Sequence, residues 1–194
     1  MQLYPVEHIS PIQLSDGTLV VLRPIHPIDG KQAHSFREKL SIESIYDRFL
    51  GYVPQISDKL VKRLTEIDYS KEMAIVAEVQ GKSQKEIIAI VRIVGETDNE
   101  AEFAIIIADN WQGKGLGKIM TNYVLSIAQE MGFAKIYALV FSSNTQMLEI
   151  LRRKGFKLKI EDESIIRAQL NIGNKSSRRL LHRLKTKKSN KSTQ

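Results

Sequence analysis

Three glycines at alternate positions, Gly113, Gly115 and Gly117, lie in the stretch 109–121. This stretch follows an apolar run with strand character, residues 103–108, and opens a segment whose apolar residues recur at helical spacing. A strand, a glycine-rich turn and a helix start are therefore expected in that order. Glycines there leave backbone N–H groups uncovered where the helix dipole is positive, which favours an anion such as phosphate. The alternative is a helix start whose glycines serve packing only.

The spacing of the loop excludes two common phosphate-binding motifs. In the Walker pattern G-x-x-x-x-G-K-[ST], Gln112 would replace the first glycine and Ile119 the hydroxyl residue. The dinucleotide pattern G-x-G-x-x-G has a different glycine spacing. The pattern Q/R-x-x-G-x-G/A does fit, through Gln112, Gly115 and Gly117. In this the loop resembles the acetyl-CoA pyrophosphate loop of the GNAT N-acetyltransferase superfamily.

The resemblance extends over residues 14–172 and is closest to the acetyltransferase domain of bacterial Pat-type protein lysine acetyltransferases. In many of these enzymes the domain is fused to a large acyl-CoA-synthetase-like domain. Several separate matches in order are more specific than one loop. They are Asp16-Gly17-Thr18, Leu22-Arg23-Pro24-Ile25, Ser44-x-Tyr46-x-Arg48-Phe49, Leu64-Thr65-x-Ile67-Asp68-Tyr69, Glu72-Met73-Ala74 and Ala101-Glu102-Phe103-Ala104.

Hydrophobic periodicity and turn signals predict an α+β domain, in which consecutive strands pair antiparallel and the helix-separated pair is parallel. Residues 1–16 are expected to be irregular, because they contain Pro5, Pro11 and a turn signal. The resemblance implies the GNAT fold, a mixed, mainly antiparallel sheet of six to seven strands with helices on both faces. The expected strands are 18–25, 73–79, 86–94, 100–108, 134–141, 156–160 and 164–172, and the expected helices are 27–40, 41–50, 57–67, 116–131 and 144–154.

Acetyl transfer to an amine requires a neutral nucleophile, and a lysine with a pKa of ~10.4 is rarely neutral at pH 7. A base that accepts its proton offsets part of this ~4–5 kcal/mol deficit. Glu102 is the candidate base: it lies a few residues before the loop and matches the catalytic glutamate of the resembled family. Strand alternation places it on one face with Ala104 and Ile106. A solvated carboxylate at a strand start is the alternative, with Glu100, then Glu72 and Asp68, as substitutes.

The cofactor implied by the resemblance is acetyl-CoA. The amides of Gly113, Lys114, Gly115, Leu116, Gly117 and Lys118 are expected to hold the pyrophosphate, with Gln112 completing the motif and the two lysines adding attraction. A solvated helix start is the alternative for these lysines. Backbone groups of Ile105 and Ile107 are implied to pair with the pantetheine arm. Asn144 matches an asparagine that also contacts the cofactor, and it is equally suited to a plain helix N-cap.

One position departs from the family pattern. Many GNAT enzymes carry a tyrosine seven residues after the asparagine as the acid for the leaving thiolate, and here Leu151 stands there. Either the thiolate leaves without a dedicated acid, or water or a hydroxyl such as Ser142 or Ser143 serves. With no cysteine in the chain, direct transfer in a ternary complex is favoured over an acyl-enzyme.

Composition indicates a single soluble domain: 194 residues, 42% hydrophobic and 26% charged. No apolar run approaches the ~20 residues of a membrane span, and the N-terminus lacks a signal-peptide pattern. The absence of cysteine excludes disulfides and thiolate zinc sites, and the four histidines are isolated, so no metal site is expected. A cytoplasmic protein is the expectation.

Positive charge is concentrated at the C-terminus. Residues 173–194 contain eight Lys and Arg and no acid, one more than the net charge of +7, so residues 1–172 together carry −1. The chain is therefore divided into a domain, 1–172, and a basic, flexible tail, 173–194. The tail is a candidate contact for an acidic partner, nucleic acid or membrane.

Three functions remain open from the sequence. The first is acetyl-CoA-dependent transfer to a protein lysine, for example on an acyl-CoA synthetase. The second is acetylation of a small amine, and the third is a CoA-binding regulatory module without chemistry. Retention of Glu102 favours the two enzymatic functions, whereas Leu151 keeps the third open.

Overall fold

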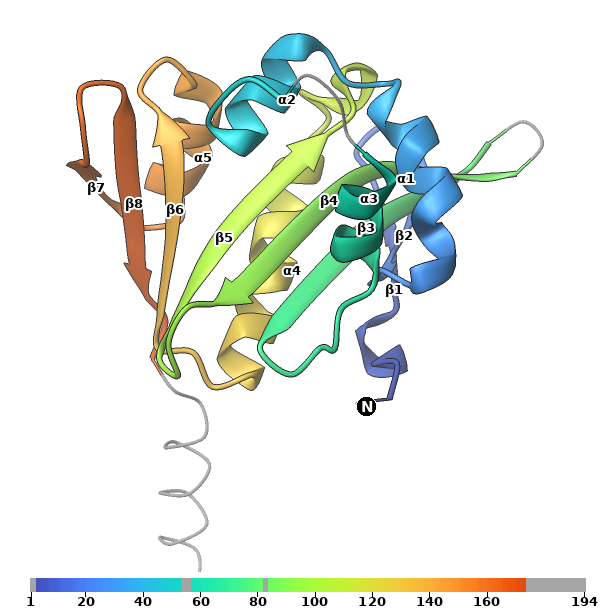
Figure 1. Cartoon of the computed structure of the whole chain (residues 1–194), viewed down its shortest axis with the longest axis horizontal. Coiled ribbons are helices and arrows are strands. Elements are labelled where there is room, and N and C mark those ends of the chain that lie inside the picture. The colour runs from blue at the N-terminus through green and yellow to red at the C-terminus, as the bar shows by residue number, and fades with distance from the viewer. Residues whose placement is uncertain (1–2, 54–56, 82–83, 174–194) are drawn as a thin grey trace, which may run out of the picture.

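The computed structural model describes residues 3–53, 57–81 and 84–173, and one mixed sheet forms its centre (Figure 1). Its strand order is β1-β2-β3-β4-β5-β6-β8-β7, and every neighbouring pair is antiparallel except β5 and β6. The eight strands are β1 (Ser10–Gln13), β2 (Leu19–Pro24), β3 (Glu72–Gln80), β4 (Lys85–Gly95), β5 (Glu100–Ile107), β6 (Lys135–Phe141), β7 (Lys157–Ile160) and β8 (Ile165–Asn171).

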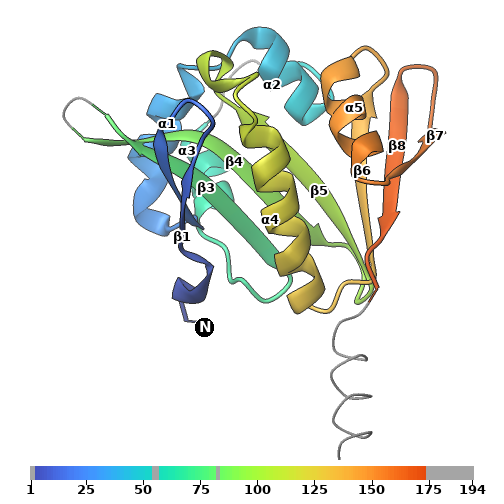
Figure 2. The same ribbon diagram turned by 180° about the vertical axis from the view of Figure 1, so that it is seen from behind.

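Helices cover both faces of the sheet: α1, α2 and α3 lie on one face, and α4 and α5 lie on the other (Figures 1 and 2). Two apolar clusters match these layers, one around Phe103, Met120 and Leu151 under α4 and α5, the other around Phe36 and Ile45. The helices are α1 (Gly30–Arg37), α2 (Ile42–Phe49), α3 (Asp58–Thr65), α4 (Leu116–Glu130) and α5 (Thr145–Arg153), with short 3₁₀ turns at Val6–His8, Pro27–Asp29 and Asp109–Trp111.

The predicted mixed, mainly antiparallel sheet with helices on both faces is confirmed, but the strand count of six to seven is one too low. The additional strand is β1, in the segment that was expected to be irregular. Pro11 lies opposite Val21 in this strand although it lacks a backbone donor. It is tolerated because β1 is the edge of the sheet and needs donors on one side only. The proposed tail lies outside the described residues, apart from Gly173.

The parallel strands β5 and β6 separate soon after they meet. Their ladder consists of three pairs, of which Glu102 with Tyr137 is the last, although β5 continues to Ile107 and β6 to Phe141. Beyond that pair the two strands diverge (Figure 1). Each keeps its ladder on its outer side, so the facing edges carry backbone donors and acceptors that no strand satisfies. A ligand between the strands can take up these groups.

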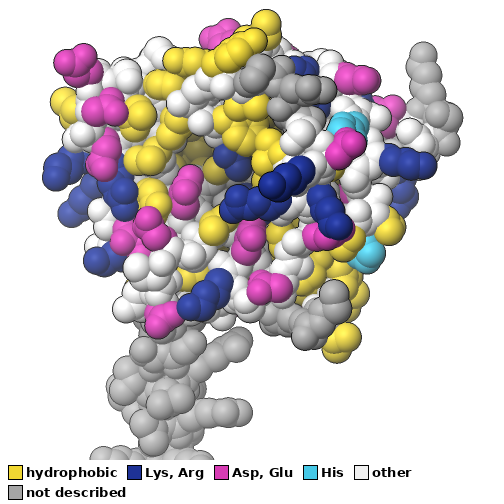
Figure 3. Space-filling view, viewed as in Figure 1, with side chains coloured by type: hydrophobic (Ala, Val, Ile, Leu, Met, Phe, Trp, Pro, Cys, Tyr) yellow, Lys and Arg dark blue, Asp and Glu magenta, His cyan; other side chains and the backbone are white. Residues whose placement is uncertain are grey.

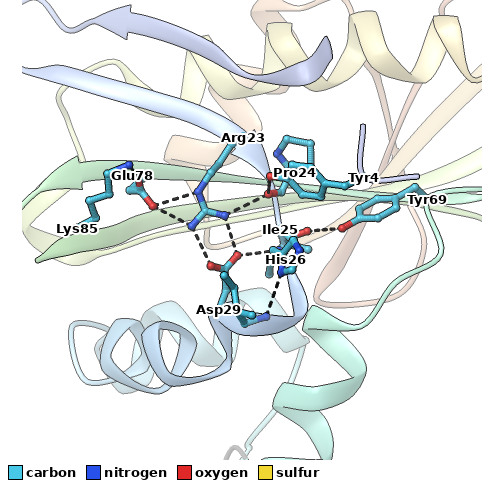
Figure 4. Close-up of polar contacts among 10 residues, drawn as sticks. Tyr4, Arg23, Pro24, Ile25, His26, Asp29, Tyr69, Glu78 and Lys85 are labelled. Atoms are coloured by element: carbon cyan, nitrogen blue, oxygen red, sulfur yellow. Dashed lines mark hydrogen bonds and ion pairs between the residues drawn. The ribbon is translucent and has the colours of Figure 1, made fainter. Parts of the chain in front are cut away.

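A buried ion cluster ties the start of α1 to the sheet (Figure 4). The Arg23 guanidinium of β2 donates to both oxygens of Asp29, at 2.8 and 2.9 Å, and to Glu78 of β3 at 2.8 Å. Asp29 also accepts from the backbone N–H of His26 at 2.7 Å. Burial alone would lower the pKa of Arg23, but hydrogen bonds and charge from the two carboxylates outweigh it and raise the pKa above the usual range.

Candidate active site

The gap between β5 and β6 opens into a large cavity, with a volume of about 1030 Å³. Space-filling representation shows a hollow lined by hydrophobic side chains over this gap, next to α2 (Figure 3). Its walls come from β5, the glycine loop, β6, one side of α5 and one side of α2. The cavity therefore joins the predicted phosphate loop to the point where the strands diverge.

The loop has the backbone geometry of an anion site. Gly113 and Gly115 have φ of 73° and 84°, in the left-handed region that glycine adopts without strain. Gly115 begins α4 without any side-chain cap among the described residues, so the first N–H groups of the helix stay available. Gly117 lines the cavity, and a Cβ there would approach the tips of Ile107 and Ile150 to 3.3 Å.

The predicted cofactor residues differ in where their side chains point. Ile105, Ile107, Gln112, Gly113, Gly115, Gly117, Lys118 and Asn144 line the cavity. Lys114 does not: its Nζ lies 4.7 Å from the centre of the Trp111 ring and 3.4 Å from Asp16. Leu116 is 1% exposed, and its side chain belongs to the core. These two residues can offer the cavity only their backbone.

Gln112 and Asn144 use their side chains within the protein. The Gln112 amide donates to the Ile107 carbonyl at 3.2 Å and to the Ser44 hydroxyl at 3.1 Å, so it braces the turn against α2. Asn144 accepts from the Met147 N–H at 3.0 Å as the N-cap of α5 and donates to Asp47 of α2 at 2.7 Å. Both residues therefore shape the cavity walls.

Helix α2 is fastened to both walls. At its start, Asp109 of the loop accepts from the Ser41 N–H at 2.8 Å and from the Ser44 hydroxyl at 2.7 Å. On the other wall, the Asp47–Asn144 bond joins α2 to α5. In addition, Tyr46 stacks on Phe141, with 4.9 Å between ring centres. The Ser44-x-Tyr46-x-Arg48-Phe49 match signalled this helix, but sequence reasoning did not assign it to the site.

Glu102 lies at the point where the strands diverge, paired with Tyr137, and not on the cavity wall itself. Within the described part of the chain its carboxylate has no hydrogen bond or ion pair. The substitutes are occupied: Glu100 pairs with Arg167 at 3.3 Å, and Glu72 pairs with Arg92. Burial, followed by the charges of Glu102 and Glu96, raises the pKa of Tyr137 to about 12, so this phenol stays protonated at neutral pH.

Asp68, the last substitute for the base, accepts from the N–H and hydroxyl of Ser70 at 2.9 and 2.8 Å in a turn. Leu151 is fully buried in the core under α5, so a hydroxyl for the leaving group has to come from elsewhere. Of the two serines considered for this role, Ser143 lines the cavity and Ser142 does not.

The loop geometry gives a testable expectation for cofactor affinity. Gly115→Ala places a side chain at φ 84° and strains the loop by about 1–2 kcal/mol, which is expected to weaken acetyl-CoA binding about five- to thirtyfold in calorimetry. Gly132→Ala is the matched control, because Gly132 has φ 95°, equally open surroundings and no place in the cavity. Equal affinity of the two variants would contradict a binding role for the loop.

Residues 41–156 match the model of the acetyltransferase (GNAT) family. The chain belongs to the GNAT family. Members transfer an acetyl group from acetyl-CoA, and the cavity, with its open strand edges and uncapped loop amides, fits such a co-substrate. Among the described residues, no group of three or more His, Asp or Glu could hold a metal ion.

Individual GNAT relatives agree with this assignment. Acetyltransferase PA5475 of Pseudomonas aeruginosa is 31% identical over 144 residues, which cover 74% of this chain and 77% of the relative. Acetyltransferase Pat of Mycolicibacterium smegmatis is 28% identical over 84% of this chain, which spans only 48% of that protein. The spermidine N(1)-acetyltransferase of Escherichia coli is 28% identical over 73% of this chain and 75% of its own length.

Among solved structures, the GNAT domain of S. lividans PAT superposes with a TM-score of 0.80 at 28% identity. The match covers 87% of this chain and 99% of that domain. The predicted GNAT fold and the similarity to Pat-type domains are confirmed. No helix in the described ranges is long and apolar enough to cross a membrane.

Proposed function

We propose that this GNAT protein transfers the acetyl group of acetyl-CoA directly to the ε-amine of a protein lysine, with Glu102 as general base. The observation that carries the proposal is the cavity between β5 and β6, which runs from the uncapped loop amides to Phe103, the residue next to Glu102, where the strands diverge. An elongated thioester bound along it has its phosphates at one end and its acyl group near a carboxylate at the other.

The backbone supports the proposed orientation of the donor. The pyrophosphate binds the N–H groups of Gly113 to Lys118 at the start of α4, where the helix dipole favours negative charge. The pantetheine amides pair with the open edge of β5 at Ile105 and Ile107. About 13 Å separate Ile107 from Phe103 along an extended strand, so the thioester lies well inside the protein, near Glu102.

In the reaction, the lysine nitrogen loses a proton to Glu102, directly or through one water, and attacks the thioester carbonyl carbon. The C–N bond forms while the carbonyl electron pair moves to oxygen. As the tetrahedral intermediate collapses, the C–S bond breaks and its electron pair leaves on the CoA sulfur. The second proton of the attacking nitrogen passes through water or the Ser143 hydroxyl, which acts as a relay, to the thiolate, so that the amide and free CoA thiol are formed.

Similarity to the GNAT domain of PAT over most of the chain favours a protein lysine as acceptor. An acyl-CoA synthetase is one candidate protein, and a cytoplasmic site of action accords with a cysteine-free sequence. Similarity to a spermidine acetyltransferase supports the second candidate, transfer to a small polyamine. The proposed contact of residues 173–194 with an acidic partner lies outside the described structure.

The test follows CoA release with a thiol reagent, which the cysteine-free chain itself does not consume. An acyl-CoA synthetase and spermidine are offered as acceptors, and the synthetase after chemical acetylation of its lysines is the control. We expect turnover and lysine acetylation, located by mass spectrometry, with the unblocked synthetase only. Turnover of spermidine alone would establish the small-amine function. If the protein binds acetyl-CoA but turns over none of a broad set of protein and amine acceptors, the result would support the third function, a CoA-binding regulatory module.

A further inference from the structure

Arg48, in the last turn of α2, is a charged residue that sequence reasoning did not assign to the site. Its side chain lines the cavity, and its guanidinium carbon lies 5.1 Å from the centre of the Phe49 ring. Helix α2 ends immediately afterwards at Leu50, which takes the left-handed conformation with φ 53°. Arg48 is partly buried, yet it forms no ion pair or hydrogen bond with any residue that the structure describes.

Burying a charged guanidinium lowers the stability of the fold unless a hydrogen bond or an opposite charge compensates it. Burial lowers the pKa of Arg48, and the carboxylate of Glu102 opposes this decrease. The pKa of the neighbouring Arg92 is also lowered. Burial, together with the charges of Arg48 and Arg63, brings it to about 10. Arg92, however, is held by Glu72 and by the Leu64 carbonyl.

Two acidic residues near Glu102 already pair with arginines. On this face of the sheet, Glu100 is taken by Arg167 and Glu72 by Arg92. The remaining carboxylate near the Tyr137 phenol is Glu96, on the β4–β5 turn. Arg48 and Glu102 form no such contact among the described residues. They are nevertheless neighbours, because Arg48 lines the cavity together with Phe103 and Ala104, the two residues that follow Glu102 on β5.

We infer that Arg48 is the positioning residue of Glu102, whose carboxylate it directs from the end of the β5–β6 ladder toward the cavity. The inference rests on the proposed function, because it assumes that Glu102 is the base. Acyl-CoA and acceptor displace water from the cavity when they bind, which strengthens the attraction between the two side chains. Arg48 thus acts on the amine proton through Glu102.

A double-mutant cycle tests this inference. Arg48→Met is expected to lower kcat about ten- to a hundredfold, as a displaced base would, with the affinity for acetyl-CoA changed less than twofold. In the Glu102→Gln background the same substitution is expected to change kcat less than twofold, since the group that it positions is gone. Arg48→Lys keeps the charge and should recover most of the loss.

The controls separate the possible failures. Arg63→Met removes an exposed arginine of α3 from the same side of the sheet and should leave kcat unchanged. If the double variant loses kcat by the product of the two single losses, the two side chains act independently. That result would overturn the inference but not the proposed function. An unchanged kcat in Glu102→Gln alone would overturn both. If Arg48→Met unfolds, Arg48→Lys and Arg48→Gln complete the cycle, and equal loss in both would also reject the role.

Discussion

Glu102→Gln is expected to lower kcat for the protein acceptor by about 10²- to 10⁴-fold, the contribution typical of a general base. The amide keeps the shape of the side chain but cannot accept the amine proton. Since Glu102 lies outside the cavity lining, the affinity for acetyl-CoA should change little. Steady-state kinetics together with calorimetry on the same preparation measure both quantities.

Glu100→Gln is the matched control for this substitution. Glu100 lies two residues earlier on the same face of β5, but Arg167 holds its carboxylate at 3.3 Å. We expect less than a tenfold loss of kcat for it. A larger loss for Glu100→Gln than for Glu102→Gln would exchange the roles of the two glutamates.

The second large effect concerns stability. Arg23→Met leaves the carboxylates of Asp29 and Glu78, which are 2% and 4% exposed, without their shared guanidinium. Removing one partner of a buried ion pair costs about 3–5 kcal/mol, because the remaining charge stays buried. Lys85, 3.0 Å from Glu78, compensates only one of the two acids. We expect a decrease in melting temperature of about 10 °C, measured by calorimetry.

Lys71→Met serves as the control for an ion pair in water. Lys71 lies 3.0 Å from Asp98, but both side chains are largely exposed, so its loss should change the free energy of unfolding by less than about 1 kcal/mol. Arg23→Lys keeps the positive charge but loses the bidentate contact, so its free energy of unfolding should lie between those of Arg23→Met and Lys71→Met. Equal stability of Arg23→Met and wild type would mean that the cluster contributes nothing net.

Local patterns predicted most of the fold. The apolar periodicity of 73–79, 86–94 and 116–131 follows directly from burial on one or both faces, and the structure confirms these elements. The first strand was missed, because Pro11 signals irregular backbone and only its place at the sheet edge makes a strand tolerable. That place depends on the strand order, which no local pattern contains.

The site was predictable where backbone geometry defines it and less so where side chains meet across elements. Glycine spacing pointed to the loop, and the structure places positive φ at Gly113 and Gly115. The contact of Lys114 with Asp16 joins residues 98 positions apart, so nothing near the loop announces it. Arg48 was part of a recognised match, but its relation to Glu102 depends on how α2 crosses β5. The roles of these residues stay predictions.

The two attachments of α2 also bear on self-association. Open strand edges are templates onto which a strand of another molecule can add, and this chain carries two of them facing each other inside its sheet. Because Asp109 holds one end of α2 and Asn144 holds its other side, the helix lies across that opening. A foreign strand would have to displace the helix before it could insert. We therefore expect the same contacts that shape the cavity to hinder aggregation at these two interior strand edges.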